Sequence, residues 1–283
     1  MVLNINPAVR DATSAYFAGK KISWHWHANH GLSSQVSCLN FLMPLATRPK
    51  LLANVIGGAL GLPGTSLTML PVEDAPDGTK MFVGFEWIGG RDYLNETKTP
   101  RQRTRGANVT SADAVVRFEH GGRRETLLIE WKYTETYGQP IPPKGNDVRL
   151  GRYRDLLFSP AGPVRADAGL AVTDFFWEPF YQMARQQMLA FRMQEAREDG
   201  AERVRVLHIS PAGNLPLHGV TAPALKALGT DAFEVFRSLL VRPDDFISAA
   251  TESVFGAALA AAGPEDRPWA DYLLGRYGFM RPT

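Results

Sequence analysis

Three charged residues stand at a spacing that suits metal-dependent hydrolysis of a phosphodiester. Asp113 is followed seventeen residues later by Glu130-Trp131-Lys132. Carboxylate oxygens are the ligands that Mg²⁺ and Mn²⁺ prefer in proteins. Such an ion would lower the pKa of a bound water and neutralise charge on a phosphate. A neighbouring lysine could orient that water or stabilise developing negative charge. These residue types therefore indicate a site for metal-assisted chemistry on a phosphate.

The run at residues 126–133 indicates a strand that would place two of these charges together. Side chains alternate between the two faces of a strand, so Glu130 and Lys132 would share one face while Ile129 and Trp131 share the other. A strand this apolar is typical of the centre of a sheet, covered on both faces. Buried charges are costly unless they are paired or bind a metal. The pattern therefore favours a functional pair over a surface ion pair.

A second strand-like run, at residues 112–119, precedes the first and ends at His120-Gly121-Gly122. Two such runs joined by a short glycine-containing turn are typical of a β-hairpin. The hairpin would fold Asp113, at the head of its strand, back beside Glu130. The alternative is that Asp113 is a turn residue next to a surface strand.

The other elements suggest how these strands are held. Hydrophobic spacing predicts helices at residues 32–45 and 178–198, a short helix at 49–60, and strands at 81–88 and 203–210. From residue 221 onward the chain indicates two or three more helices. We therefore expect an α/β fold with a central mixed sheet flanked by helices, and extra C-terminal helices.

The spacing of Asp113 and Glu130-Trp131-Lys132 resembles the core of the PD-(D/E)xK nuclease superfamily, and the order helix, three strands, helix, strand resembles its common core. More narrowly, residues 105–113, 129–137 and the helix around 180–190 resemble a bacterial family of restriction endonucleases. The proline that often precedes the aspartate is Ala112 here. The resemblance implies a restriction-endonuclease-like core at about residues 30–212 of a single nuclease domain (1–283), with a helical extension at about 213–283.

The same resemblance implies an activity and a set of site residues. The chain would be an Mg²⁺-dependent nuclease acting on DNA, plausibly in restriction or defence, with Mn²⁺ as a substitute ion. Asp113, Glu130 and a backbone carbonyl near Trp131 would hold the metal, and Lys132 would be the catalytic lysine.

Two other functions are open. A non-catalytic nucleic-acid-binding module could retain the same fold. A glycosidase could use Asp113 and Glu130 as an acid–base pair, but Lys132 would hold the pKa of the acid down. Neither alternative requires Mg²⁺, so metal dependence separates them from the nuclease.

Buried amides on two helices are candidates to support the site. Gln187 falls on the apolar face of the helix at 178–198, where an unpartnered amide would cost about 1–3 kcal/mol. We therefore expect it to find a partner near the metal site or on the backbone, while Gln182 and Gln186 project further from that face. Gln35 stands on the first helix where several superfamily members have a glutamate. Glu86, in the first strand, could approach the site but is expected to face solvent at an edge.

Basic residues suggest where a nucleic acid could bind. The densest run comprises Lys98, Arg101, Arg103 and Arg105, close before Asp113. It would contact phosphates and give salt-dependent affinity, or it is a solvated loop. A second, weaker group comprises Arg149, Arg152 and Arg154. In the segment 24–30, packing or nucleic-acid contact by the tryptophans is a better interpretation than a histidine metal site.

The bulk composition sets limits on these interpretations. The chain has 283 residues, 45% hydrophobic and 21% charged, with a net charge of +2, which is ordinary for a globular protein and excludes a strongly cationic binder. The single cysteine, Cys38, excludes an internal disulfide and a cysteine-rich zinc site. The sequence shows neither a secretory leader nor a membrane span, so we expect a cytoplasmic protein with no membrane partner. A homodimer would suit cutting both strands of a duplex.

Overall fold

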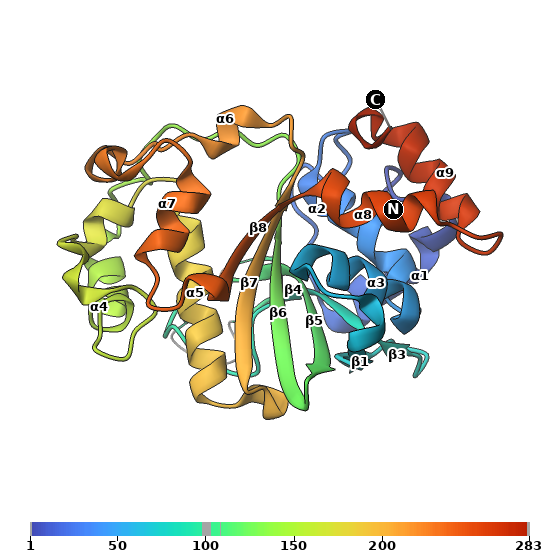
Figure 1. Cartoon of the computed structure of the whole chain (residues 1–283), viewed down its shortest axis with the longest axis horizontal. Helices are drawn as coiled ribbons and strands as arrows, with labels where there is room; N and C mark the ends of the chain where they lie inside the picture. Colours follow the sequence, from blue (N-terminus) through green and yellow to red (C-terminus); the bar gives the residue numbers. More distant parts are fainter. Residues whose placement is uncertain (1, 98–102, 108, 282–283) are drawn as a thin grey trace.

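The computed structural model describes residues 2–97, 103–107 and 109–281. A central sheet runs through the molecule with helices on both of its faces (Figure 1). The sheet is built from β1 (Thr68–Leu70), β4 (Val83–Trp87), β5 (Ala112–His120), β6 (Arg123–Trp131), β7 (Arg203–Ser210) and β8 (Phe246–Ala250). The expected α/β architecture with a mixed central sheet, consistent with a restriction-endonuclease-like fold, is therefore confirmed.

The strand order is β1-β5-β6-β7-β8, and β4 also pairs with β5. β4 pairs with the first half of β5 and β1 with its second half, so both lie along the same edge. β5 and β6 are antiparallel, whereas β6, β7 and β8 are mutually parallel neighbours. A separate small sheet pairs β2 (Glu73–Asp74) with β3 (Lys80–Met81).

The hairpin between β5 and β6 forms as the sequence predicts. His120 pairs with Arg123, which leaves Gly121 and Gly122 as a two-residue loop. Both glycines have positive φ, 55° and 77°. A two-residue loop with two left-handed residues matches the twist of the flanking strands, and glycine adopts that conformation without steric cost. This turn fixes the register that brings the two acidic strand ends together.

Helices cover both faces of the sheet, and one of the two layers combines helices from the two ends of the chain (Figure 1). One layer contains α1 (Arg10–Lys20), α2 (Ser34–Leu42), α3 (Pro49–Leu60), α8 (Thr251–Ala260) and α9 (Arg267–Arg276). The other contains α4 (Asn146–Leu157), α5 (Phe180–Glu195), α6 (Leu215–His218) and α7 (Ala232–Leu239). Short 3-10 helices span Pro7–Val9, Met43–Leu45, Gly64–Ser66, Ala166–Ala168, Val172–Phe175, Glu198–Gly200, Pro223–Leu228, Pro243–Asp245 and Gly278–Met280.

The two layers follow the alternation of β6. Leu127, Ile129 and Trp131 pack into the core that α2 and α3 cover. Leu128 packs into the core that α5 covers. This is the period-two pattern that the sequence predicts for the strand, and it leaves Glu130 on the α5 side.

Several elements differ from the sequence-based expectations. The helices at 32–45 and 49–60 are confirmed, as are the strand at 203–210 and the long helix, which is shorter at both ends. The expectation that the C-terminal part is purely helical is wrong, because β8 adds a parallel strand to the sheet beside β7. α1 and α4 were not expected. None of the described helices combines the length and apolar character that crossing a membrane requires.

Candidate active site

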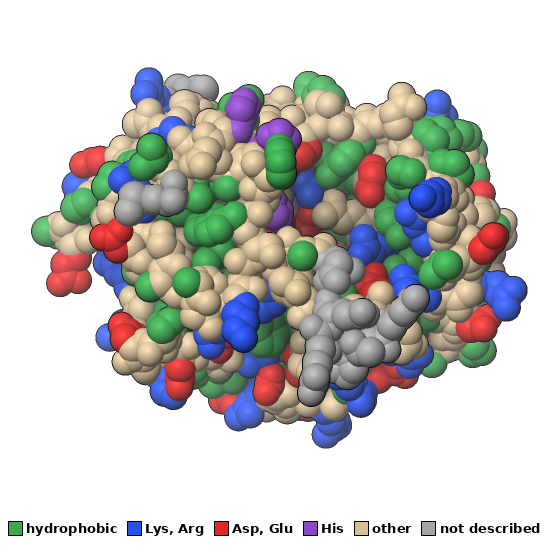
Figure 2. Space-filling model, turned by 180° about the vertical axis from the view of Figure 1, so that it is seen from behind, with side chains coloured by type: hydrophobic (Ala, Val, Ile, Leu, Met, Phe, Trp, Pro, Cys, Tyr) green, Lys and Arg blue, Asp and Glu red, His purple; other side chains and the backbone are tan. Residues whose placement is uncertain are grey.

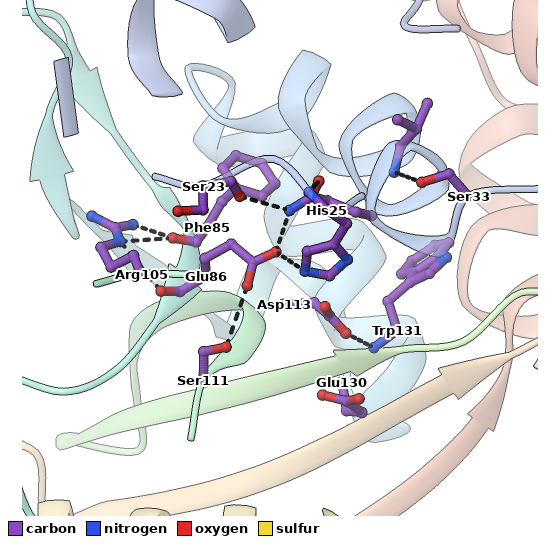
Figure 3. A network of polar contacts seen from close by, with 12 residues as sticks. Ser23, His25, Ser33, Phe85, Glu86, Arg105, Ser111, Asp113, Glu130 and Trp131 are labelled. Carbon is purple, nitrogen blue, oxygen red and sulfur yellow. Dashed lines mark hydrogen bonds and ion pairs between the residues drawn. The ribbon is translucent and has the colours of Figure 1, made fainter. Parts of the chain in front are cut away.

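The hairpin brings the acidic residue of β5 to the end of β6. Ala114 pairs with Ile129, so Asp113 lies beside Glu130 where the two strands open. Asp113 Oδ2 accepts a hydrogen bond of 2.7 Å from the backbone N–H of Trp131 (Figure 3). The indole of Trp131 is buried on the other side and donates to Ser37 Oγ at 3.2 Å. The backbone at Trp131 is thus directly next to the Asp113 carboxylate.

Glu130 and Lys132 form a buried ion pair on the α5 side of the strand. Lys132 Nζ lies 2.5 Å from Glu130 Oε1, and the two residues are only 8% and 4% exposed. Burial alone would lower the pKa of Lys132, but the nearby negative charge, chiefly that of Glu130, outweighs it and raises the pKa well above its usual value. The side chain is therefore an ammonium ion at neutral pH. It can stabilise negative charge but is not poised to accept a proton.

Two glutamines of α5 complete the contacts of Glu130. Gln182 Nε2 donates to Glu130 Oε1 at 2.5 Å, and Gln186 Nε2 donates to Glu130 Oε2. Gln186 also reaches the carbonyl of Ser111 at 3.3 Å. Residues four apart project from the same side of a helix, so both amides can meet one carboxylate.

Gln187 does not take the place that its helical face suggested. It is buried as expected, but its side chain lines a different pocket, together with Phe191, Val204 and Arg242. Among the described residues its Oε1 has no hydrogen-bond partner. Each residue advances about 100° around a helix, so Gln187 and its neighbour Gln186 point to different surroundings although both are buried. The expected partnership of Gln187 with the site is therefore corrected in favour of Gln182 and Gln186.

Glu86 lies inside the site and not at a solvent-facing edge, so that expectation is wrong. It is 2% exposed, and its carboxylate accepts from Gln35 Nε2 at 2.6 Å and from Ser111 Oγ at 3.3 Å (Figure 3). His25 Nε2 lies 3.3 Å from the same carboxylate. Glu86 has a left-handed backbone, with φ of 50°, and the ladder pairs its neighbours on β4 but not Glu86 itself. This interruption of the strand lets the side chain face α2.

The charged groups at this end of the sheet influence one another's ionisation. Burial raises the pKa of Asp113 well above its usual value, and the charges of Glu130 and Glu86 add to that effect while Lys132 opposes it. The hydrogen bond to Glu86 is the largest cause of a raised pKa at His25, which burial opposes. Three carboxyl groups therefore gather beside one lysine and one histidine.

His208 of β7 borders the same cluster. It pairs in register with Glu130, and its ring lies 4.1 Å from that of Phe233. Burial lowers the pKa of His208 well below its usual value, with Lys132 adding to the effect, so the ring is neutral. Among the described residues its Nδ1 has no hydrogen-bond partner. A histidine in an otherwise apolar strand-like run is the sequence signal that could have identified it.

The site offers oxygen donors of the kind that a divalent cation requires. Among the described residues no group of three or more His, Cys, Asp or Glu side chains converges so as to hold a metal ion. Two carboxylates remain, Asp113 and Glu130, beside the backbone of Trp131. They are hard oxygen donors, and the pKa of Asp113 is raised first by burial and then by the charge of Glu130, both of which a divalent cation at this place would offset. The residues therefore fit an ion such as Mg²⁺.

In the described part of the basic run before β5, the arginines bind other groups of the same chain. Arg105 does not face solvent phosphates as expected, because its guanidinium forms two 3.0 Å contacts with Glu73 and lies over the ring of Trp87 at 5.3 Å. Arg103 donates to the carbonyls of Ile88 and Gly89, at 2.5 and 2.8 Å. Lys98 and Arg101 lie outside the described residues. Glu73 and the backbone carbonyls that follow β4 therefore bind these two arginines.

Figure 2 shows the face behind the view of Figure 1. Near its middle the surface is hollowed, and histidine, acidic and basic side chains gather in and around the hollow.

A comparison with protein families gives a match over nearly the whole chain. The model of a family described as a restriction endonuclease associating with ARP matches residues 1–278. No curated protein and no solved structure matches the chain.

Proposed function

Because the chain belongs to this restriction endonuclease family, we propose that it is a metal-dependent nuclease that hydrolyses phosphodiester bonds of DNA. The observation that carries the proposal is the buried Glu130–Lys132 pair beside Asp113, at the end of neighbouring strands. Family membership supports nuclease activity. The metal, the DNA substrate and the site residues are the proposed part.

Asp113, Glu130 and a backbone carbonyl near Trp131 would hold Mg²⁺, or Mn²⁺ as a substitute. When bound, the ion would supply a water of lowered pKa and positive charge against the phosphate. Hydrolysis forms a bond from the water oxygen to phosphorus, breaks the bond from phosphorus to the leaving sugar oxygen, and leaves a proton on that oxygen.

The side chains of this chain have separate tasks in that reaction. The Lys132 ammonium would orient the attacking water and stabilise negative charge on the phosphate. Gln182 and Gln186 would fix the direction of Glu130 through their amides. A homodimer in the cytoplasm, with one site for each strand of a duplex, belongs to the same proposal.

One observation favours a second candidate, a module that binds nucleic acid without cutting it. Both oxygens of Glu130 are already satisfied, one by Lys132 and Gln182 and the other by Gln186. A metal ion at Glu130 would have to share these oxygens with the amides. Cleavage and binding must therefore be measured separately.

The test is incubation of the purified chain with supercoiled plasmid and with linear DNA, in Mg²⁺, in Mn²⁺ or in EDTA. Lys132→Ala and Asp113→Asn are the site variants, and Lys50→Ala, at an exposed lysine of α3, is the matched control. We expect cleavage in Mg²⁺ or Mn²⁺ by the wild type and the control alone. Binding without cleavage by all proteins would favour the non-catalytic module. Cleavage that persists in both site variants would place the active site elsewhere.

A further inference from the structure

We propose that the turn at residues 24–30 holds an unpaired nucleotide of the substrate, with the indole of Trp26 stacked on its base. This inference rests on the proposed nuclease function and specifies its substrate class. The strand that enters the site would be single-stranded, or locally unstacked, next to the bond that is cut.

Trp26 is exposed to an extent that packing does not explain. It is 94% exposed, whereas Trp24, two residues earlier, stacks on Phe17 with ring centroids 4.1 Å apart at an interplanar angle of 20°. Ala28, two residues later, is buried. Burying a tryptophan is strongly favourable, so an indole held in water between two anchored neighbours indicates a surface for a partner.

The backbone of the turn is held in place by its own hydrogen bonds. The N–H of His25 donates to Gln35 Oε1 at 2.9 Å. The N–H of Ala28 donates to the carbonyl of His25 at 3.0 Å, and that of His30 to the carbonyl of His27 at 2.8 Å. A group that is ordered before binding loses less entropy when a ligand arrives. Trp26 is thus presented on an ordered support.

The turn is joined directly to the carboxylate cluster. The imidazole of His25 contacts Glu86 at 3.3 Å, and Glu86 and Asp113 line one small pocket together with Gln35 (Figure 3). Consecutive Cα atoms are about 3.8 Å apart. Trp26 therefore follows directly in the chain on a residue that contacts the site, and we infer that its indole meets a nucleotide near the reacting phosphate.

The sequence around the turn carries no acidic residue of its own. No Asp or Glu occurs between Asp11 and Glu73 in the sequence. Two cations of this stretch are already paired, Lys20 with Glu73 and Arg48 with Asp266. The acidic groups closest along the contacts are Glu86 and Asp113 of the site, whose charge the proposed metal would offset.

The chemistry of the contact defines the substrate form. Every base has a π face, so stacking on an indole tolerates any sequence. Inside a regular duplex those faces are covered by neighbouring bases, and a base must be unpaired or turned out of the helix to reach a side chain. The turn therefore selects for a single strand, a frayed end or a distorted duplex.

The experiment measures binding of a fluorescein-labelled oligonucleotide of about 16 nucleotides, within the range of single-strand sites. It is offered as a single strand and as a duplex, in EDTA and in Ca²⁺. Trp26→Ala should weaken single-strand binding by about 5- to 150-fold, the range expected for loss of one stacked base. Trp26→Phe keeps an aromatic ring and should bind within about threefold of the wild type. Leu228→Ala, at another exposed apolar residue, should bind as the wild type does.

Tryptophan fluorescence gives a second readout. Single-stranded DNA should quench the wild-type emission, and Trp26→Phe should bind without that quenching. Equal single-strand affinity of Trp26→Ala and wild type would overturn the proposal, as would an equal loss of duplex and single-strand affinity. A change in oligomeric state on gel filtration would identify Trp26 as a self-association contact and would also overturn it. If plasmid cleavage persists in any of these cases, the nuclease function stands while this inference fails.

Discussion

Two adjacent glutamines of α5 should respond in opposite directions to the same substitution. Gln186 and Gln187 are both buried, at 2% and 3% exposure, but one donates to the Glu130 carboxylate and the other leaves its carbonyl oxygen without a partner. Methionine is close to glutamine in shape and makes no strong hydrogen bond. Gln186→Met removes a hydrogen bond to a charged group, which costs about 1.5–3 kcal/mol. Gln187→Met removes an unsatisfied polar group, which relieves about 1–3 kcal/mol.

The assay is chemical denaturation, paired with the rate of plasmid cleavage. The free energies of unfolding of the two variants should differ by at least about 2.5 kcal/mol, with Gln187→Met the more stable. Gln186→Met should also cleave about 10- to 100-fold more slowly, because a misdirected Glu130 displaces the reacting groups. Gln187→Met should cleave as the wild type does. The reasoning is refuted if Gln187→Met is the variant that loses stability and cleavage while Gln186→Met loses neither.

Three further predictions concern charge and backbone. Asp113→Asn should raise the melting temperature at neutral pH, because the raised pKa of Asp113 means that its ionisation destabilises the folded state. The gain should shrink as the pH falls toward the pKa of the carboxyl group in the unfolded chain, and thermal unfolding measured across a range of pH checks both statements. Glu73→Gln should cost about 3–5 kcal/mol in denaturation, since it leaves Arg105 buried without its ion partner, and a neutral result would show that the pair contributes nothing. Gly122→Ala should cost about 1–2 kcal/mol from its φ of 77°, while Gly213→Ala, which meets no neighbour, is the matched control and should be near neutral.

The central strands were predictable because their sequence pattern is local. The strand at 203–210 carries Val204, Val206, Leu207 and Ile209 in a short strand-like run and has the predicted bounds. β8 is only five residues long, includes Ser248, and becomes a strand through its pairing with β7. Such pairing is a tertiary effect that propensity does not encode. α4 was missed for a related reason, because it buries only Tyr153, Leu156 and Leu157 and has little apolar periodicity.

The contrast between local pattern and tertiary effect also explains which parts of the site could be predicted from the sequence. Period two and a glycine turn were enough to predict that Asp113 would lie beside Glu130. The position of Glu86 was not predictable, since it depends on a left-handed backbone that a glutamate rarely adopts. The partners of Glu130 also depend on the exact rotation of α5, where one residue turns a side chain by about 100°.

The way charge is balanced distinguishes this cluster from the ion pairs that stabilise the fold. At the other end of β6, Glu125 lies 2.7 Å from Arg205, and Glu73 of the small β2–β3 sheet meets Arg105, so each of these two carboxylates has its own guanidinium. Glu86, Asp113 and Glu130 have instead a lysine, a partly exposed histidine and neutral amides. Uncompensated buried charge destabilises a folded protein. A cation bound at this end of the sheet would offset that cost, which is the physical argument for the proposed metal.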